Sequence, residues 1–490
     1  MIKAGFEELL PDEIKVFKKK SDRIGDVYNQ HACITSAKFA YFIKNIYKRI
    51  GDKAYNDKVF EIIWDIFDLI IIDEAHSIVT DASYQEAPFY LYDFIRHFDT
   101  DCRDSSKHML LLTATPEPIE NVCNVLNDLH TYDFSEVCAG VVPKSVSIID
   151  NKEVKKEIEA KYLEDKNWKC VYFYSGDITL VEDFCKGTKI NHDEVVSLFS
   201  KEKHRDGLKR YNESEYNKML EAEGSIIKNG TLPNNIRILL VTSKFKEGVD
   251  FKWYFNTMYI DSHTKDDVIQ MSGRARLQNH EVKIVMDSKE FHWFDSFEKE
   301  SESLKSDYGT LNSLNKRFEE LPNEERQTFI EQVTNPSADR TNNGEQYHPY
   351  IQFSYLDNKF KIYATKALYF KYLKESYIKW HKKNSKLKPN YHQKILQDWF
   401  KGVVIEPYYS KDFLVKQILT KYTKYANEPI NKEKHESIKN ALFEVYGEEH
   451  RISWFLKLID SNYKYERDEH TKMYRFIRFR KNSPKKISRN

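Results

Sequence analysis

Two adjacent carboxylates follow a short apolar run in the first part of the chain. The stretch DLIIIDEAH at 68–76 places Asp73 and Glu74 directly after an isoleucine-rich segment, which favours a strand buried on both faces of a parallel sheet. The carboxyl ends of such strands form the edge at which open α/β sheets bind ligands. Adjacent acids at that edge need a positive partner, and Mg²⁺ carrying nucleotide phosphates is the usual one. A solvated acidic turn after an ordinary strand is the alternative.

Small hydroxylated residues end a second apolar run. Residues 109–112 precede Thr113 and Thr115, and the segment 85–98 between the two runs has the apolar spacing of a helix. A strand, a helix and a strand in this order place both polar clusters at one edge of one parallel sheet. The hydroxyls could therefore sense a phosphate beside the acids; ordinary threonines at a strand end are the alternative.

A predicted helix further along carries an amide and two guanidinium groups. Gln270 and Arg274 are four residues apart and share one helix face, and Arg276 follows closely. Arginines held on a rigid helix can stabilise the charge of a transferring phosphoryl group. The alternative is a set of surface ion pairs worth roughly 0–1 kcal/mol each. Strands predicted around this helix form a second α/β domain, at 169–176, 236–241, 256–261 and 282–287.

Length and composition limit the class of protein. A chain of 490 residues with 40% hydrophobic residues predicts two to four domains. It has no run of about 18 apolar residues and no secretory signal at its start, so no membrane partner is expected. The six cysteines show no CxxC or Cys/His metal spacing, which is typical of reduced thiols in a cytoplasmic protein.

The net charge of +1 hides a strong asymmetry. From Lys361 onward there are 30 Lys and Arg against 14 Asp and Glu, which leaves 47 basic and 62 acidic residues in the rest of the chain. A basic last third favours a partner that carries phosphates. A solvated, lysine-rich helical surface is an equally good interpretation.

The last third is predicted to be mainly helical after one β-hairpin. The hairpin turns at Asp357 and Asn358. In the next helix Tyr369, Leu373, Tyr377 and Trp380 fall on one face, with lysines around it. Such an aromatic stripe is more often core than a platform for stacked bases. We therefore predict an α/β protein with two parallel-sheet domains at 1–150 and 151–295, and a basic, mostly helical accessory domain at 296–490.

The motifs together resemble those of superfamily 2 DExH-type helicases. DEAH at 73–76, TAT at 113–115, EGVD at 247–250 and QMSGRAR at 270–276 follow the order and domain placement of that family, and CITSAKF at 33–39 resembles its motif Ib. The resemblance covers residues 25–295 and implies that the two parallel-sheet domains are RecA-like, the first of them incomplete. It implies a motor that hydrolyses ATP with Mg²⁺ and moves on DNA or RNA, closing its two domains when ATP binds.

The same resemblance assigns roles to single residues. Asp73 would hold Mg²⁺ through water, and Glu74 would act as general base. His76, Thr113 and Thr115 would couple the nucleotide state to domain closure. The second domain would line the nucleotide cleft with Gly248, Asp250, Gln270, Arg274 and Arg276. Contacts to nucleic-acid phosphates are implied for Thr35, Ser175 and Thr242.

One departure from the family is clear. The P-loop motif, GxxxxGK followed by Ser or Thr, occurs nowhere in the chain, although its amides and lysine cradle the phosphates. Three explanations are open: a fragment of a longer or interrupted gene, a split enzyme whose P-loop comes from a second polypeptide, or a helicase-like clamp without hydrolysis. We favour the fragment and predict weak ATP binding and little hydrolysis by this chain alone.

The leading functional prediction is thus an ATP-dependent helicase or translocase that lacks the P-loop. A catalytically silent nucleic-acid-binding or scaffold protein is the runner-up. The motor part of a restriction or phage-defence complex is a third possibility, which nothing in the sequence decides.

Overall fold

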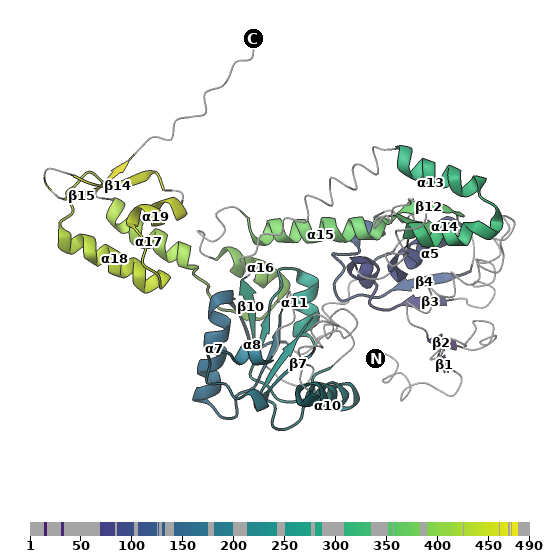
Figure 1. Ribbon diagram of the computed structural model, residues 1–490, viewed down its shortest axis with the longest axis horizontal. Coiled ribbons are helices and arrows are strands. Elements are labelled where there is room, and N and C mark those ends of the chain that lie inside the picture. The colour runs from purple at the N-terminus through teal and green to yellow at the C-terminus, as the bar shows by residue number, and fades with distance from the viewer. Residues whose placement is uncertain are drawn as a thin grey trace, which may run out of the picture. The chain divides into compact units, whose positions relative to one another are not determined.

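The fold was analysed in a computed structural model of the chain (Figure 1). Within the part of the chain that the model describes, no helix has both the length and the apolar character needed to cross a membrane. The described residues are 14–16, 31–33, 69–83, 86–101, 106–124, 126, 130–132, 142–174, 181–198, 213–242, 250–275, 280–286, 308–334, 351–355, 357–382, 390–424, 426–459, 461–468, 471 and 473–478.

The largest described sheet has seven strands in the order β13-β5-β10-β9-β6-β8-β7. The pairs β6–β8, β6–β9, β7–β8 and β13–β5 are parallel. Strands β7, β8 and β9 are buried at every position, as expected for parallel strands covered on both faces. The α/β class predicted from the sequence is therefore confirmed. The strands cover Ser145–Asp150 (β5), Cys170–Phe173 (β6), Val195–Leu198 (β7), Ile238–Val241 (β8), Thr257–Ile260 (β9), Glu281–Met286 (β10) and Val404–Ile405 (β13).

Helices alternate with the strands of this sheet. The helix α7 begins after Asp150, whose carboxylate accepts a hydrogen bond from the Lys152 amide at 3.0 Å and thereby caps it. Near the other end of α7, the Arg237 guanidinium lies 3.9 Å from the centre of the Tyr162 ring and donates to Glu194 at 3.2 Å. These contacts fix α7 against the strand ends. The helices cover Asn151–Glu164 (α7), Val181–Cys185 (α8), Glu213–Asn229 (α10) and Lys265–Ser272 (α11).

The acidic pair follows a separate two-stranded parallel sheet. Strand β3 (Leu69–Ile72) pairs with β4 (His108–Leu111), and residue 71 lies opposite residue 110. One face of this sheet packs against a core that includes α5 (Ala87–Asp101), which confirms the predicted order of strand, helix and strand. Short helices α4 (Ser77–Thr80) and α6 (Glu120–Cys123) complete this region. A further parallel pair joins β1 (Ile14–Val16) to β2 (His31–Cys33).

The opposite face of β3 and β4 is exposed. Leu69 and Ile71 are 51% and 55% exposed, and Leu110 and Leu112 are 43% and 41% exposed. The prediction that this strand is buried on both faces is therefore wrong. A four-residue apolar run predicts a strand with one buried face. It does not show that the second face is buried as well.

Residues from the last third of the chain join the same core as α5. Helices α13 (Tyr308–Glu320) and α14 (Asn323–Thr334) and the antiparallel hairpin of β11 (Ile351–Ser354) and β12 (Lys359–Ile362) contribute to it. The hairpin turns at Asn358, which has a φ of 50°, as predicted. Part of the segment assigned to an accessory domain thus packs with the acidic-pair region. The division at 150 and 295 remains a prediction.

Helix α15 (Ala364–Trp380) carries the predicted aromatic stripe. Its last residue, Trp380, is fully buried and stacks on Trp399 of α16 (Tyr391–Trp399) with ring centres 5.5 Å apart. The Trp380 carbonyl also accepts a hydrogen bond from the His392 ring at 2.8 Å. The remaining members of the stripe, at 369, 373 and 377, are half-buried, so the stripe packs rather than facing solvent.

The C-terminal described residues form a small core of their own. It joins α17 (Lys411–Thr423), α18 (Lys432–Tyr446) and α19 (Ile452–Leu458) to the antiparallel hairpin of β14 (Tyr463–Arg467) and β15 (Tyr474–Arg478). The three helices agree with the sequence prediction, whereas the hairpin was not predicted.

Candidate functional site

The acidic pair lies where β3 ends. Asp73 is exposed, and its carboxylate accepts a hydrogen bond from the Glu74 amide at 3.0 Å. Glu74 is half-buried and has a φ of 51°, in the left-handed region that favours glycine. Non-glycine residues in this conformation concentrate at functional sites, where the surrounding structure holds them. The surrounding structure therefore holds the Glu74 backbone in a conformation that a glutamate does not favour by itself.

A buried histidine joins the ends of β3 and β4. His76 is fully buried, and its Nδ1 lies 3.1 Å from the Thr113 hydroxyl and 3.5 Å from a Glu74 carboxylate oxygen. The Thr113 hydroxyl donates to the Thr115 carbonyl at 3.1 Å, so Nδ1 donates to Thr113. The Thr115 hydroxyl is fully buried and has no hydrogen-bond partner in the described part of the chain. Thr113 and Thr115 thus lie beside the acidic pair, as predicted.

The buried polar face of α11 continues into the turn after the helix. The predicted helix carried Gln270 and both arginines, but α11 ends at Ser272, so Arg274 lies two residues beyond its end. Asp266, Gln270 and Arg274 follow one another at intervals of four residues and are 3%, 7% and 5% exposed. Burying a guanidinium is costly unless it is hydrogen-bonded, and Arg274 donates to the side-chain Oε1 of Gln270 at 3.0 Å. The Arg274 carbonyl accepts from the Phe251 amide at 2.8 Å. This bond ties the end of α11 to the segment that contains Asp250.

The two polar clusters meet through one contact. The Gln270 side-chain amide donates to the Glu74 carboxylate at 3.4 Å, across a separation of 196 residues. Glu74, Gln270 and Arg274 therefore form a continuous series that starts at the end of β3, passes through α11 and ends in the turn after that helix. This contact places Gln270 next to the acidic strand end, and the roles assigned to these residues stay predictions.

The remaining predicted site residues are less informative. Thr242 follows β8, is half-buried, and its amide donates to the Leu198 carbonyl at 3.2 Å. Asp250 is half-buried in the segment before β9. Four predicted residues lie outside the described part of the chain: Thr35, Ser175, Gly248 and Arg276.

The donor set suits part of a nucleotide complex. Exposed carboxylate oxygens at Asp73 are ligands that Mg²⁺ accepts, with water completing its shell. The Thr115 hydroxyl, which has no hydrogen-bond partner in the described part of the chain, is one further donor. The Arg274 guanidinium is another, and it is bonded to Gln270, which in turn contacts Glu74. No P-loop sequence exists in the chain to cradle the β- and γ-phosphates. The residues therefore fit the metal and the reacting end of a triphosphate better than they fit the whole molecule.

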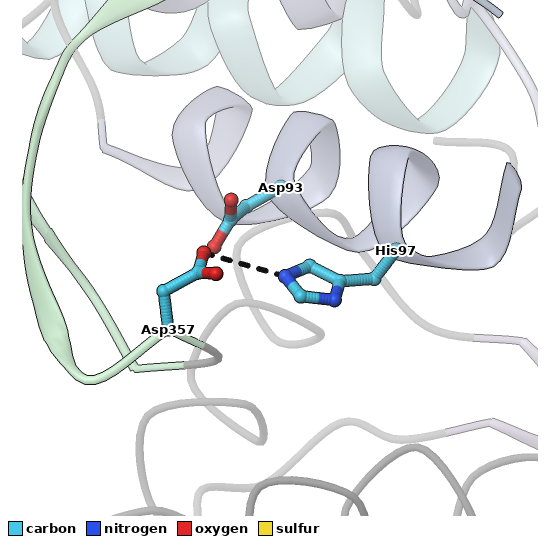
Figure 2. Close-up of side chains that lie close together, drawn as sticks. All are labelled: Asp93, His97 and Asp357. Atoms are coloured by element: carbon cyan, nitrogen blue, oxygen red, sulfur yellow. Dashed lines mark hydrogen bonds and ion pairs between the residues drawn. The ribbon is translucent and has the colours of Figure 1, made fainter. Parts of the chain in front are cut away.

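A second cluster of charged side chains was not predicted. Figure 2 shows Asp93 and His97 on α5 close to Asp357 of the hairpin turn, and all three offer ligand atoms within 4.8 Å of one another. The Lys361 ammonium lies 2.9 Å from the Asp93 carboxylate and also pairs with Asp357. Because Lys361 already supplies a cation to both carboxylates, the cluster is an ion-pair network that fastens the hairpin to α5. It does not have the free donors of a metal site.

The charges of this network shift the pKa values of its members. Burial disfavours the ionised form of Asp357, but hydrogen bonds and charge from His97 and Lys361 outweigh it and hold its pKa well below the usual range. Burial acts in the opposite sense on Lys361, where Asp93 and Asp357 outweigh it and raise the pKa. Both groups therefore stay ionised at neutral pH.

Comparisons with known proteins give weak similarities only. No protein-family model and no curated protein matches the chain. Similar solved structures include S. cerevisiae Dbp5 bound to RNA and ADP BeF3, at 12% identity and a TM-score of 0.33, over 60% of this chain and 67% of that one. A DEAD box protein from Methanococcus jannaschii has 13% identity and a TM-score of 0.30, over 61% of this chain and 73% of that one. The helicase MrfA bound to DNA and AMPPNP has 14% identity and a TM-score of 0.34, over 59% and 39%. These scores are too low to carry an argument, so the interpretation rests on the residues and their geometry.

Proposed function

We propose that this chain is the larger part of an ATP-dependent motor that moves on nucleic acid, of the superfamily 2 DExH type. The observation that carries the proposal is the contact between Glu74 and Gln270, with Arg274 bonded to the same glutamine. A buried amide and guanidinium facing an acidic strand end suit an anionic ligand that brings its own cation. The charges of the acidic strand end and of Arg274 are not expected to neutralise each other directly.

The chemistry assigned to the chain is hydrolysis of ATP. Water attacks the γ-phosphorus, the bond from that phosphorus to the β–γ bridging oxygen breaks, and ADP leaves. Glu74 polarises the water and accepts its proton. Gln270 orients the same water or the nucleotide, and Arg274 stabilises charge that develops on the phosphoryl oxygens. His76 holds Glu74 and Thr113 in fixed positions relative to each other through its Nδ1. A change at the phosphate therefore alters the loop after β4. Mg²⁺ held by Asp73 through water supplies neutralising charge when it is bound.

The proposal includes a phosphate cradle that is supplied by sequence outside this chain. The exposed apolar face of β3 and β4 supports this part of the proposal, because parallel strands are normally covered on both faces. Leu69, Ile71, Leu110 and Leu112 form that face, on the strands whose ends carry Asp73 and Thr113. A P-loop-bearing segment, either continuous with this chain in the natural gene or on a second polypeptide, would cover the face and bring its amides to the acids.

DNA or RNA is the proposed track. The basic excess of the last third supports a partner with regularly spaced phosphates. Thr35, Ser175 and Thr242 remain proposed phosphate contacts, by resemblance alone.

The experiment measures binding and turnover separately. Fluorescence anisotropy with labelled single-stranded DNA and RNA should show binding by the isolated chain that weakens as salt rises. ATP hydrolysis by the chain alone should stay near background. Coexpression with a GxxxxGK-containing polypeptide encoded directly upstream of the Met1 codon should give turnover that nucleic acid stimulates. The variant Glu74→Gln should lower that turnover roughly 100-fold or more, whereas Glu120→Gln, an exposed acid on α6, should not.

Each contrary result has a clear meaning. Robust turnover by the isolated chain would refute the need for an outside cradle. Turnover that Glu74→Gln leaves unchanged would refute the assigned chemistry. The second candidate function, a silent nucleic-acid clamp, is favoured by the absent P-loop. It would be supported if the chain binds nucleic acid and the upstream sequence encodes no P-loop.

A further inference from the structure

The first turn of α11 makes two polar contacts with elements outside the seven-stranded sheet. The Lys265 ammonium pairs with Glu117, which lies just beyond Thr115. The Tyr372 hydroxyl of α15 donates to the Asp266 carboxylate at 2.5 Å. Lys265 and Asp266 are adjacent, so two separate segments hold the same turn of the helix.

The Asp266 contact is a demanding one. Its carboxylate is 3% exposed, and a buried carboxylate needs strong donors. Burial and the neighbouring Asp266 charge raise the pKa of the Tyr372 hydroxyl far above its usual value. Tyr372 therefore remains a proton donor to Asp266 at any pH at which the protein would work.

The other end of this linkage is fixed in the core that supports the acidic pair. Ala364, Leu368 and Tyr369 of α15 pack against the core that also holds Ile70 and Ile72 of β3. Leu368 and Tyr372 are four residues apart, so one face of the helix makes both contacts. Because an α-helix is stiff over such a short distance, Tyr372 is held in a fixed place relative to that core.

We propose that Tyr372 is a positioning residue that holds the buried polar face of α11 against the end of β3. Asp266, Gln270 and Arg274 share this face, so a bond at its first residue sets where the next two lie. The positioning role rests on the proposed function, because its purpose is to bring Gln270 and Arg274 close to Glu74. Tyr372 acts on Gln270 and Arg274 through its bond to Asp266.

The test measures the approach of α11 to β3 without using ATP. Cysteines introduced by Glu74→Cys and Gln270→Cys replace two side chains that are in contact, and a short bismaleimide reagent links them. The 74–270 product is identified by peptide mass spectrometry, which separates it from products of native cysteines. Adding Tyr372→Phe should slow the linking about tenfold, in line with loss of a hydrogen bond to a charged group.

Three further variants make the result specific. Tyr391→Phe removes another tyrosine hydroxyl bonded at 2.5 Å, to the Lys379 carbonyl, and should leave the linking rate unchanged. Asp266→Asn keeps an acceptor for Tyr372 and should link nearly as fast as the parent pair. Asp266→Ala should link as slowly as Tyr372→Phe, and the combination of the two should be no slower.

The outcomes separate the two proposals. An unchanged linking rate in Tyr372→Phe would overturn the positioning role, and so would equal slowing by Tyr391→Phe. If the linking results are as expected but the complemented protein fails to hydrolyse ATP, the positioning role of Tyr372 stands and the proposed function fails. If turnover is present, Tyr372→Phe should lower kcat more than it raises KM, because it acts on groups that meet the transition state.

Discussion

At the scale of single residues, Glu74 combines a carboxylate with a backbone conformation that favours glycine. Its φ of 51° places it in the left-handed region, which costs an L-residue roughly 1–2 kcal/mol. Glycine would relieve that cost but would remove the carboxylate. The retention of glutamate in a strained position is what a catalytic role would require.

A pair of variants isolates the free-energy cost of the left-handed backbone conformation at residue 74. We predict that Glu74→Gly is more stable than Glu74→Ala by about 1 kcal/mol, because both lack the carboxylate and only alanine keeps the strain. Thermal unfolding of the two variants, side by side, measures the difference. Equal stabilities, or a more stable alanine variant, would mean that residue 74 does not adopt the left-handed conformation in solution. Neither variant should support ATP turnover in the complemented protein.

The network around Asp357 gives a prediction about pH. Its pKa is depressed in the folded protein, so its contribution to stability is fully present above the ordinary aspartate value of about 3.9. The contribution is lost as the pH falls through the lower folded value. We predict that Asp357→Asn lowers the free energy of unfolding by about 2 kcal/mol at pH 7, and that the difference from the parent protein shrinks below about pH 4.

Chemical denaturation between pH 3 and pH 8 tests this expectation. An exposed acid on the same core, in Glu324→Gln on α14, is the control and should give a small difference that does not depend on pH. A gap for Asp357→Asn that widens on acidification would contradict the assigned sign.

At the scale of elements, α15 offers matched positions on one helix. Trp380 is 1% exposed and stacks on Trp399, whereas Ile378 is 55% exposed. We predict that Trp380→Ala destabilises the protein by roughly 3–5 kcal/mol, the usual cost of a large core cavity. Ile378→Ala should change stability by no more than about 0.5 kcal/mol. Urea denaturation measures both, and a comparable loss for the two variants would show that the stripe does not define the packed face.

The elements that the sequence predicted best are apolar runs with polar ends. Strands β6, β8, β9 and β10 and the helix α5 lie within a few residues of their predicted bounds, because local periodicity reports burial directly. Strand β7, with the short sequence VVSL, lies in a stretch whose surroundings are helical, and β13 has two residues. Such short runs show no hydrophobic period, so they can be recognised as strands only from their partners in the sheet.

The same limit applies to the candidate site. The shared face of Gln270 and Arg274 follows from their spacing on a helix, and the closeness of Thr113 to Asp73 follows from adjacent parallel strands. The Tyr372–Asp266 bond and the Lys361 network join positions 106 and 268 residues apart. Nothing local marks such partners, since any tyrosine or lysine on those elements has the same chemistry. The contact between Glu74 and Gln270 was expected only because the order of motifs resembles a known family.

At the scale of the whole molecule, the chain combines an assembled polar cluster with an uncovered apolar face. Ile71 and Leu110 lie opposite each other in the register of β3 and β4, and both are exposed. Ile70 and Met109 are the equivalent pair on the covered face. Two neighbouring pairs on the same strands therefore sample the two faces of one sheet, which permits a controlled comparison.

We predict opposite effects for polar substitutions on these two faces. The double variant Ile71→Ser and Leu110→Ser should leave the unfolding temperature of the isolated chain nearly unchanged, because exposed positions usually contribute within about 0.5 kcal/mol. It should weaken association with a P-loop-bearing polypeptide roughly 100-fold, since burying a large apolar side chain is worth about 1.5–3 kcal/mol. The double variant Ile70→Ser and Met109→Ser should instead destabilise the isolated chain. Thermal unfolding and titration calorimetry separate the two effects. If the first variant unfolds as readily as the second, the face is covered within the isolated chain, and the phosphate cradle has to dock elsewhere.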